Sequence, residues 1–446
     1  MGEHRGVPWT RRPVLPPLTM QGTLLDLATV LLILAALFSY LNHKLLRLPL
    51  TIGLMVSGLV AAGVMLILDM MFPGLSLKQT VRQTMDMVDF PASLMQGMLG
   101  FLLFAGALHI NIEDLLRRRY VIAVLATVGV LISTAIVGSA SFLLFQAVGT
   151  DVPLAYCFVF GALISPTDPI AVLGVMKSLG APRSLEIKVA GESLFNDGVG
   201  VVVFSMLLAA AGGAGHGSTI GAGFHLADLA EVLGREVVGG LILGMIAGYL
   251  VYLLMKSLDA PNVEVLLSFA LVLGMTRTAT HLHTSAPLAC VVAGIFIGNQ
   301  GRRLAMSDRT SHALDLVWSF VDQTLNAVLF LLVGVEVMTH LSWRPAELLA
   351  ATALIFITLL GRFLSVSLPL AVMRCFMTFT PGVIRILTWG GLKGGISIAL
   401  ALSLPSFQGR TAIITATSLI IVFSVVVQGL TIGPLIRRQM ERHPAA

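Results

Sequence analysis

Thirteen stretches of apolar residues, separated by short polar breaks, divide most of the chain. Most of them have the roughly 20 residues that an α-helix needs to cross the hydrocarbon layer of a bilayer. We therefore predict an all-α, polytopic membrane protein with about 13 transmembrane helices. The predicted segments are 23–41, 48–68, 88–109, 119–148, 153–177, 182–211, 229–255, 262–282, 284–299, 318–338, 346–373, 382–404 and 411–435.

Two of these segments contain residues that do not fit a regular helix. In the fifth segment, Pro166 and Pro169 remove two N–H donors, which frees the carbonyl groups of Ala162 and Ser165. In the twelfth segment, four glycines surround Lys393. Irregular backbone is tolerated at membrane depth only where protein or a water-filled cavity covers it. Both segments are therefore predicted to unwind near the middle.

The two breaks occupy matching places in two sets of three segments, the fourth to sixth and the eleventh to thirteenth. An offset of seven segments separates the sets, so corresponding helices run in opposite directions through the membrane. Inverted-repeat transporters have this arrangement, and their broken helices cross near the bilayer midplane at the substrate site. The alternative is that these prolines and glycines are merely tolerated kinks between packed helices. This explains a single break better than two breaks in matching positions that both contain charged residues.

Composition agrees with a membrane protein and excludes other classes. The chain is 56% hydrophobic and 11% charged, with a mean hydropathy of +0.92, whereas soluble domains are about 25% charged. The pI of about 9.3 does not indicate nucleic-acid binding, because the basic residues lie singly or in short clusters between apolar runs. Loops on one side carry more than twice as many Lys and Arg residues as the others. The positive-inside rule then places the N-terminus outside and the C-terminus in the cytoplasm.

The sixth segment contains a cluster of polar and acidic residues within apolar sequence. A carboxylate near the bilayer centre is expensive, so its presence indicates a function. Ser193 and Asp197 are one helical turn apart and share a face, as do Glu192 and Asn196. Glu192 lies roughly 140° round the helix from Asp197. One acid is therefore expected to face a water-filled pocket while the other is held in an internal ion pair.

Hard alkali cations prefer oxygen ligands, and four residues near the first break offer them. These are Asp168, Thr167, Ser193 and Asp197, with no thiolate or histidine cluster among them. Burial favours protonation of a carboxylate, and a neighbouring cation opposes it. One carboxylate then holds either a proton or a cation, and alternate exposure of the site to each side makes this competition an antiport. Asp168 is also expected to cap the helix that follows it, and Asn196 to donate to the broken segment.

Five motifs, in this order along the chain, resemble signatures of the monovalent cation/proton antiporters of the NhaP and Na+/H+ exchanger type. The resemblance covers the second to thirteenth segments. The motifs are Ser165-Pro-Thr-Asp-Pro-Ile-Ala-Val172, Gly191-Glu-Ser-Leu-Phe-Asn-Asp197, Ala293-Gly-Ile-Phe-Ile-Gly-Asn299, Asn326-Ala-Val-Leu-Phe-Leu-Leu-Val-Gly334 and Gly391-Leu-Lys-Gly-Gly-Ile-Ser397.

The resemblance implies roles for particular residues. It implies that Asp197 binds both the ion and the proton, with Ser193, Asp168 and Thr167 completing an oxygen shell. It implies that Asn196 marks an electroneutral exchanger, because electrogenic relatives have a second aspartate there.

The resemblance also implies that Glu192 pairs with Arg362. Lys393 stands where most members have arginine, which leaves its partner open. Some relatives place an acid near the end of the third segment, where this chain has Phe104-Ala-Gly-Ala-Leu-His109.

The expected organisation is one transmembrane antiporter domain at 23–436 between two tails. The expected N-terminal tail is 1–22, with Met20 as an alternative translation start. The expected C-terminal tail is 437–446 and lies in the cytoplasm. The ion-binding core is expected at about 119–211 and 346–435, and a dimerisation scaffold at about 23–109 and 229–338. The expected partners are membrane lipid, monovalent cations and protons, in a bacterial inner membrane, and the resemblance implies a homodimer. We expect a role in pH homeostasis, and neither enzymatic activity nor a cofactor.

Three alternatives remain at this stage. The transported cation is Na+, K+ or Li+, because these ions ask for similar ligands. An intramembrane aspartyl protease needs a pair of aspartates such as Asp168 and Asp197, but gives no reason for Lys393, Arg362 or the broken helices. An organic-anion carrier needs more buried basic groups without acidic partners than this sequence has.

Overall fold

A computed structural model describes residues 24–72, 97–212, 226–340, 344–377, 379 and 381–442. Within these residues the secondary structure is helical apart from a single isolated β-bridge. Nine helical spans of the described chain are long and apolar enough to cross a membrane. The fold is therefore all-α and polytopic, as predicted, while the total of thirteen stays a prediction. The nine spans are 29–46, 52–71, 119–147, 183–210, 234–256, 261–282, 308–334, 345–373 and 410–442.

The two segments predicted to unwind are both broken. The first consists of α9 (Leu154–Leu163) and α10 (Ile170–Ser178), and the second of α18 (Val383–Trp389) and α19 (Gly395–Leu402). Between α9 and α10 lies the Pro-Thr-Asp-Pro sequence, in which proline cannot donate to a helical ladder. Pro169 then becomes the N-cap of α10, a place where its missing N–H costs nothing.

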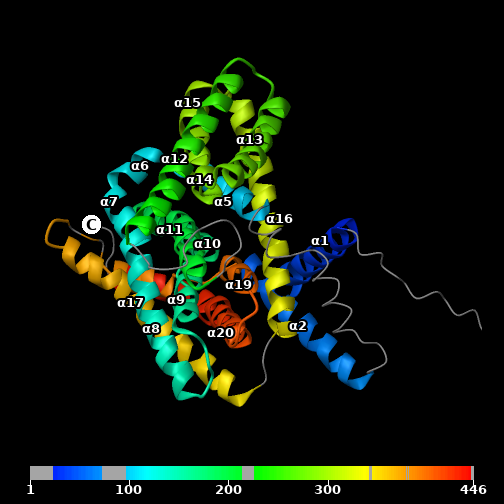
Figure 1. Ribbon diagram of the computed structural model, residues 1–446. Coiled ribbons are helices and arrows are strands. Elements are labelled where there is room, and N and C mark those ends of the chain that lie inside the picture. Colours follow the sequence, from blue (N-terminus) through cyan, green and yellow to red (C-terminus); the bar gives the residue numbers. More distant parts are fainter. Residues whose placement is uncertain are drawn as a thin grey trace, which may run out of the picture.

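Long helices surround the two broken ones and form what we name the crossing bundle, α7 to α11 with α17 to α21 (Figure 1). Its remaining members are α7 (Arg119–Val124), α8 (Val130–Ala147), α11 (Arg183–Ala210), α17 (Pro345–Met373), α20 (Arg410–Phe423) and α21 (Gly429–Arg442). One turn of π-helix joins α7 to α8 (Leu125–Gly129), and another joins α20 to α21 (Ser424–Gln428).

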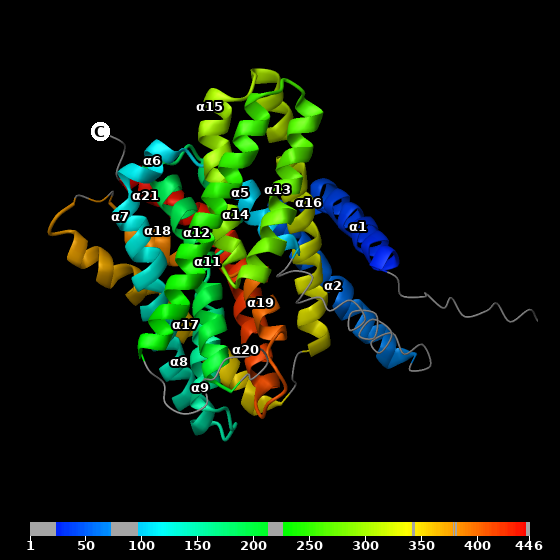
Figure 2. The ribbon, with the colours of Figure 1, turned by 45° about the horizontal axis from the view of Figure 1, so that its top comes forward.

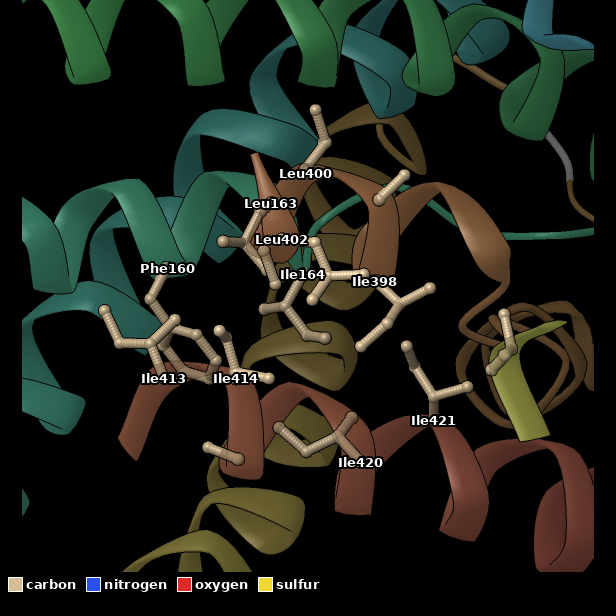
Figure 3. Packing of buried hydrophobic residues seen from close by; sticks show 14 of the residues in the cluster. Phe160, Leu163, Ile164, Ile398, Leu400, Leu402, Ile413, Ile414, Ile420 and Ile421 are labelled. Carbon is tan, nitrogen blue, oxygen red and sulfur yellow. The ribbon is translucent and has the colours of Figure 1, made fainter. Parts of the chain in front are cut away.

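An apolar cluster fills one half of the crossing bundle. Figure 3 shows side chains of α9, α19 and α20 packed against one another, among them Phe160, Ile164, Ile398 and Ile421. Each of these four side chains is at most 2% exposed. Because α9 precedes its break and α19 follows its own, the part of the cluster on these two helices lies on one side of the two breaks.

The remaining helices form the flanking bundle. In it α2 (Leu50–Met71) packs along α16 (Asp308–His340), with α1 (Leu24–Leu41) beside them. The other members are η1 (Asn42–Leu46), α5 (Leu99–Leu108), α6 (Ile112–Arg117), α12 (Leu226–Lys256), α13 (Pro261–Leu282), α14 (Ala286–Phe296), η5 (Ile297–Gly301) and α15 (Arg302–Leu304). Figure 2 shows α1 and α2 on the opposite side of the molecule from α8 and α17. Within the flanking bundle, α16 also contacts α19 and α20 of the crossing bundle.

Some helix ends differ from the sequence prediction. Helix α16 begins at Asp308 rather than at 318, and α21 continues to Arg442, so part of the expected tail is helical. Both extensions are polar, and apolar runs mark only the membrane-embedded part of a helix. The short helix α6 was not predicted, although Asn111 caps it by accepting from the N–H groups of Glu113 and Asp114. Residues 1–22 and 88–96 of the prediction lie outside the described chain.

Close contact between α2 and α16 depends on two glycines. A Cβ on Gly58 would lie 3.0 Å from the Leu331 carbonyl oxygen, and one on Gly334 would lie 2.9 Å from the Leu59 nitrogen. Small residues let two transmembrane backbones approach in this way. On the same helix, a Cβ on Gly63 would meet nothing within 4 Å.

We expect Gly58→Leu to destabilise the protein by about 1–3 kcal/mol, because the larger side chain forces α2 and α16 apart. The measurement is thermal unfolding of the purified protein in detergent. Gly63→Leu is the matched control, with the same substitution on the same helix but with open space around it. Equal melting temperatures for the two variants would contradict the proposed close contact.

Candidate ion-binding site

The two breaks meet, and their backbones pair with each other. The N–H of Asp168 donates to the carbonyl oxygen of Leu392 at 2.8 Å, which forms the isolated antiparallel bridge. The N–H of Lys393 donates to the Ser424 hydroxyl at 2.8 Å. Backbone groups released by unwinding therefore find partners on another segment or a side chain, as a buried backbone requires.

Lys393 satisfies the end of α9. Its Nζ donates to the carbonyl oxygens of Ser165 at 3.0 Å and Pro166 at 3.2 Å, and the residue is only 3% exposed. The C-terminal end of a helix carries partial negative charge, so an ammonium group is favourable there. The partner that the sequence left open is thus a pair of carbonyl groups. Two single-point contacts of this kind suit an ammonium group, which has no bidentate geometry.

Three side chains tie α11 to the first break. The Ser193 hydroxyl donates to the Thr167 carbonyl oxygen, and the two hydroxyl oxygens are 2.9 Å apart. Asn196 Nδ2 donates to Thr167 Oγ1 at 2.8 Å, and the Thr167 N–H reaches Asn196 Oδ1 at 3.4 Å. Asn196 is thus placed as a donor to the broken segment. All three residues are at most 2% exposed.

Glu192 is neutralised within the protein. Arg362 of α17 donates from Nη1 to Oε1 at 2.7 Å and from Nη2 to Oε2 at 2.8 Å. Asn196 donates to the same Oε1 at 2.9 Å, and Arg362 Nε donates to the Leu387 carbonyl oxygen at 3.2 Å. This bidentate, charge-assisted geometry is the strong form of a buried ion pair. Both carboxylate oxygens of Glu192 are thus held by donors within the protein.

Asp197 faces the other way, into a cavity of about 370 Å³ that Asp168 and Thr167 also line. Within the described residues its carboxylate takes part in no hydrogen bond and no ion pair, although the residue is only 7% exposed. Asp168 accepts from the Ile170 N–H at 2.9 Å, at the N-terminal end of α10. Of the residues expected at the site, Ser193, Glu192 and Lys393 support this cavity without lining it.

The cavity runs between the two bundles toward His109 and Lys177. A second hollow of about 630 Å³ shares His109, Ile110 and Ser319 with it and forms a vestibule. The wall facing Asp168 includes Asp322 and Asn326 of α16. The sequence analysis did not identify Asp322 as a site residue. The signal was present, because Asp322 is an acidic residue in a predicted transmembrane segment, as Asp197 is.

A family model described as "Sodium/hydrogen exchanger, transmembrane" matches residues 32–438. This chain belongs to the sodium/hydrogen exchanger family. The match spans both bundles, so the two breaks and the cavity all lie within the matched region.

The similarity to named exchangers of this family extends over most of the chain. The Na(+)/H(+) antiporter NhaP of Pseudomonas aeruginosa is 43% identical over 426 residues, which cover 93% of this chain and 97% of that protein. The Na(+)/H(+) antiporter NhaH of Halobacillus dabanensis is 34% identical over 357 residues, covering 78% and 83%. The sodium proton antiporter MjNhaP1 of Methanocaldococcus jannaschii has the same fold, with a TM-score of 0.69 at 19% identity over 93% of this chain and 98% of that one.

We expect either Glu192→Gln or Arg362→Gln to destabilise this exchanger by about 3–5 kcal/mol, because each leaves one buried charge uncompensated. The double variant should recover much of that loss, as coupled partners do in a double-mutant cycle. Thermal unfolding in detergent measures all three. Asp114→Asn is the control, since Asp114 pairs with Arg118 and with the largely exposed Arg183, and its loss leaves no fully buried charge; such solvent-screened pairs contribute about 0–1 kcal/mol. Additive effects of the two single substitutions would mean that the pair does not couple.

Proposed function

We propose that the protein is a secondary active antiporter that exchanges Na+ for H+ across a bacterial inner membrane, with Asp197 holding the two ions in turn. The observation that carries the proposal is the contrast between the two acids of α11. Glu192 is fully engaged by Arg362, whereas Asp197 lines a buried cavity without a partner among the described residues. The names of the bacterial relatives support Na+ over K+ or Li+ as the cation.

The chemistry of the cavity fits an alkali cation. Such ions take about six oxygen ligands, drawn from carboxylates, carbonyls, hydroxyls and water. Asp197 and Asp168 supply carboxylate oxygens, Thr167 lines the same space, and a cavity of about 370 Å³ leaves room for several water molecules. A proton on Asp197 removes the charge that attracts the cation, so binding of one ion displaces the other.

Access to the cavity is one-sided in this conformation. The cavity extends toward the vestibule at His109 and Asn111, and the apolar cluster of α9, α19 and α20 lies on the other side of the breaks. Loops on the vestibule side carry most of the basic residues, including Arg117, Arg302 and Arg303. The positive-inside rule makes this side cytoplasmic, with the C-terminus on it and the N-terminus outside. The conformation is therefore inward-facing.

Alternating access then follows from movement of one bundle against the other. The cavity lies between them, lined by α5 and α16 on one side and by α10, α11 and α19 on the other. We propose that the crossing bundle carries the ion and that the flanking bundle stays fixed as a homodimer scaffold. The backbone bridge between Asp168 and Leu392 supports this division, because it obliges the two broken segments to move together.

Asp197→Asn should abolish cation-dependent proton flux in proteoliposomes while the protein remains folded and inserted, because an amide cannot alternate between proton and cation. The control is Asp151→Asn, which removes an exposed acid from the loop before α9 and should leave the flux unchanged. Cation-dependent proton flux that persists in Asp197→Asn would refute the role given to this carboxylate.

Exchange should be electroneutral, with one proton for each cation, because of the two acids of α11 only Asp197 is left to change its charge state while Glu192 stays paired. In liposomes held at a set K+/valinomycin potential, Na+/H+ exchange should have the same rate and end-point at every imposed voltage. The Asp197→Asn protein supplies the leak baseline. A shift with voltage would instead require a second group, such as Asp168, to carry a proton.

A further inference from the structure

The ion cavity has a third carboxylate that comes from the flanking bundle. Asp322 of α16 lines the cavity opposite Asp168 and Asp197, and it is half-buried. Along α16, Ser319 lies at the boundary with the vestibule, and Asp322 follows it about 4.5 Å deeper. A cation that enters from the vestibule therefore passes Asp322 on its way to Asp197.

The charge of Asp322 is not neutralised by the protein. Its one hydrogen-bond donor in the described chain is the neutral amide of Asn326, whose Nδ2 lies 3.0 Å from Oδ1. Asp315, two turns earlier on the same helix, differs because Arg302 forms an ion pair with it. Asp168 lines the same cavity, and two ionised carboxylates in one cavity repel each other. A cation between these carboxylates relieves that repulsion.

A hydroxyl group in the same cavity wall also lacks a partner. Ser397 of α19 lines the cavity, is 1% exposed, and its Oγ has no hydrogen bond within the described residues. An unsatisfied buried hydroxyl is costly, so its retention calls for a partner that is absent from the protein itself. An alkali cation accepts such an oxygen as a ligand.

We propose that Asp322, with Asn326 and Ser397, forms a second cation subsite on the path to Asp197. It binds a partly hydrated monovalent cation, holds it by one carboxylate and two neutral oxygens, and passes it to Asp168 and Asp197. This inference rests on the proposed antiport for its place in the transport cycle. Because Asp322 belongs to the flanking bundle, it does not travel with the ion and leaves the exchange ratio unchanged.

The first test is the KM for Na+ in proteoliposomes at fixed pH. Asp322→Asn should raise KM by roughly five-fold or more, because a negative charge in a low-dielectric cleft concentrates cations there. The maximal rate should stay within about two-fold, since saturating Na+ makes the subsite unnecessary. Asp322→Glu should restore most of the affinity. Asp308→Asn, the same change at an exposed position on the same helix, should leave KM unchanged.

The second test uses Ser397→Ala. A hydroxyl that is merely unsatisfied can be removed without loss of stability, so this variant should fold as well as the wild type. A raised KM with an unaltered melting temperature supports a ligand role. The two substitutions combined should raise KM by less than the product of their separate effects, because both act on one bound ion.

The outcomes separate this inference from the proposed function. If the wild-type protein shows no Na+-dependent proton flux, the antiport proposal fails. If the wild type is active but Asp322→Asn keeps its KM, or loses only maximal rate and stability, the subsite is refuted and Asp322 is structural. An unchanged KM in Ser397→Ala removes that hydroxyl from the subsite.

Discussion

Unwound backbone inside a membrane must find new hydrogen-bond partners, and this requirement organises the molecule. The two breaks supply hydrogen-bond partners to each other where they cross. The Asp168 N–H donates to the Leu392 carbonyl, and Lys393 donates to the carbonyls of Ser165 and Pro166. Thr167 receives its partners from α11. The polar atoms that remain after this pairing, above all the carboxylates of Asp168 and Asp197, are the ones that an ion can use.

Charge is divided in a similar way between structure and function. In the Glu192–Arg362 pair, with Asn196 as an added donor, the charge of one acid of α11 is compensated inside the protein. The ammonium group of Lys393 donates to backbone carbonyl groups rather than to a carboxylate. The wall of the cavity is thereby left with more acidic than basic side chains, and in the proposed antiport this excess attracts a small cation that is released once a proton arrives.

Much of this arrangement could be predicted from the sequence, because local rules decide it. Proline and glycine chemistry located both breaks, and the helical angle between Glu192 and Asp197 separated their directions. The partner of Lys393 and the place of Asp322 depend on which segments lie side by side. The hydrophobic periodicity of a single helix does not determine which other helices pack against it. Ser193 shows the same limit. The contact of its hydroxyl with the Thr167 carbonyl also depends on which segments meet, and its role as an ion ligand stays a prediction.

The crossing also has a consequence for how the chain is made. The carbonyl groups that Lys393 satisfies precede it by 228 and 227 residues, so they enter the membrane long before the ribosome reaches the lysine. During that interval the end of α9 has lost its helical partners and has not gained the final ones. These two carbonyl groups therefore need other hydrogen-bond partners, such as water, until the segment that carries Lys393 has been inserted.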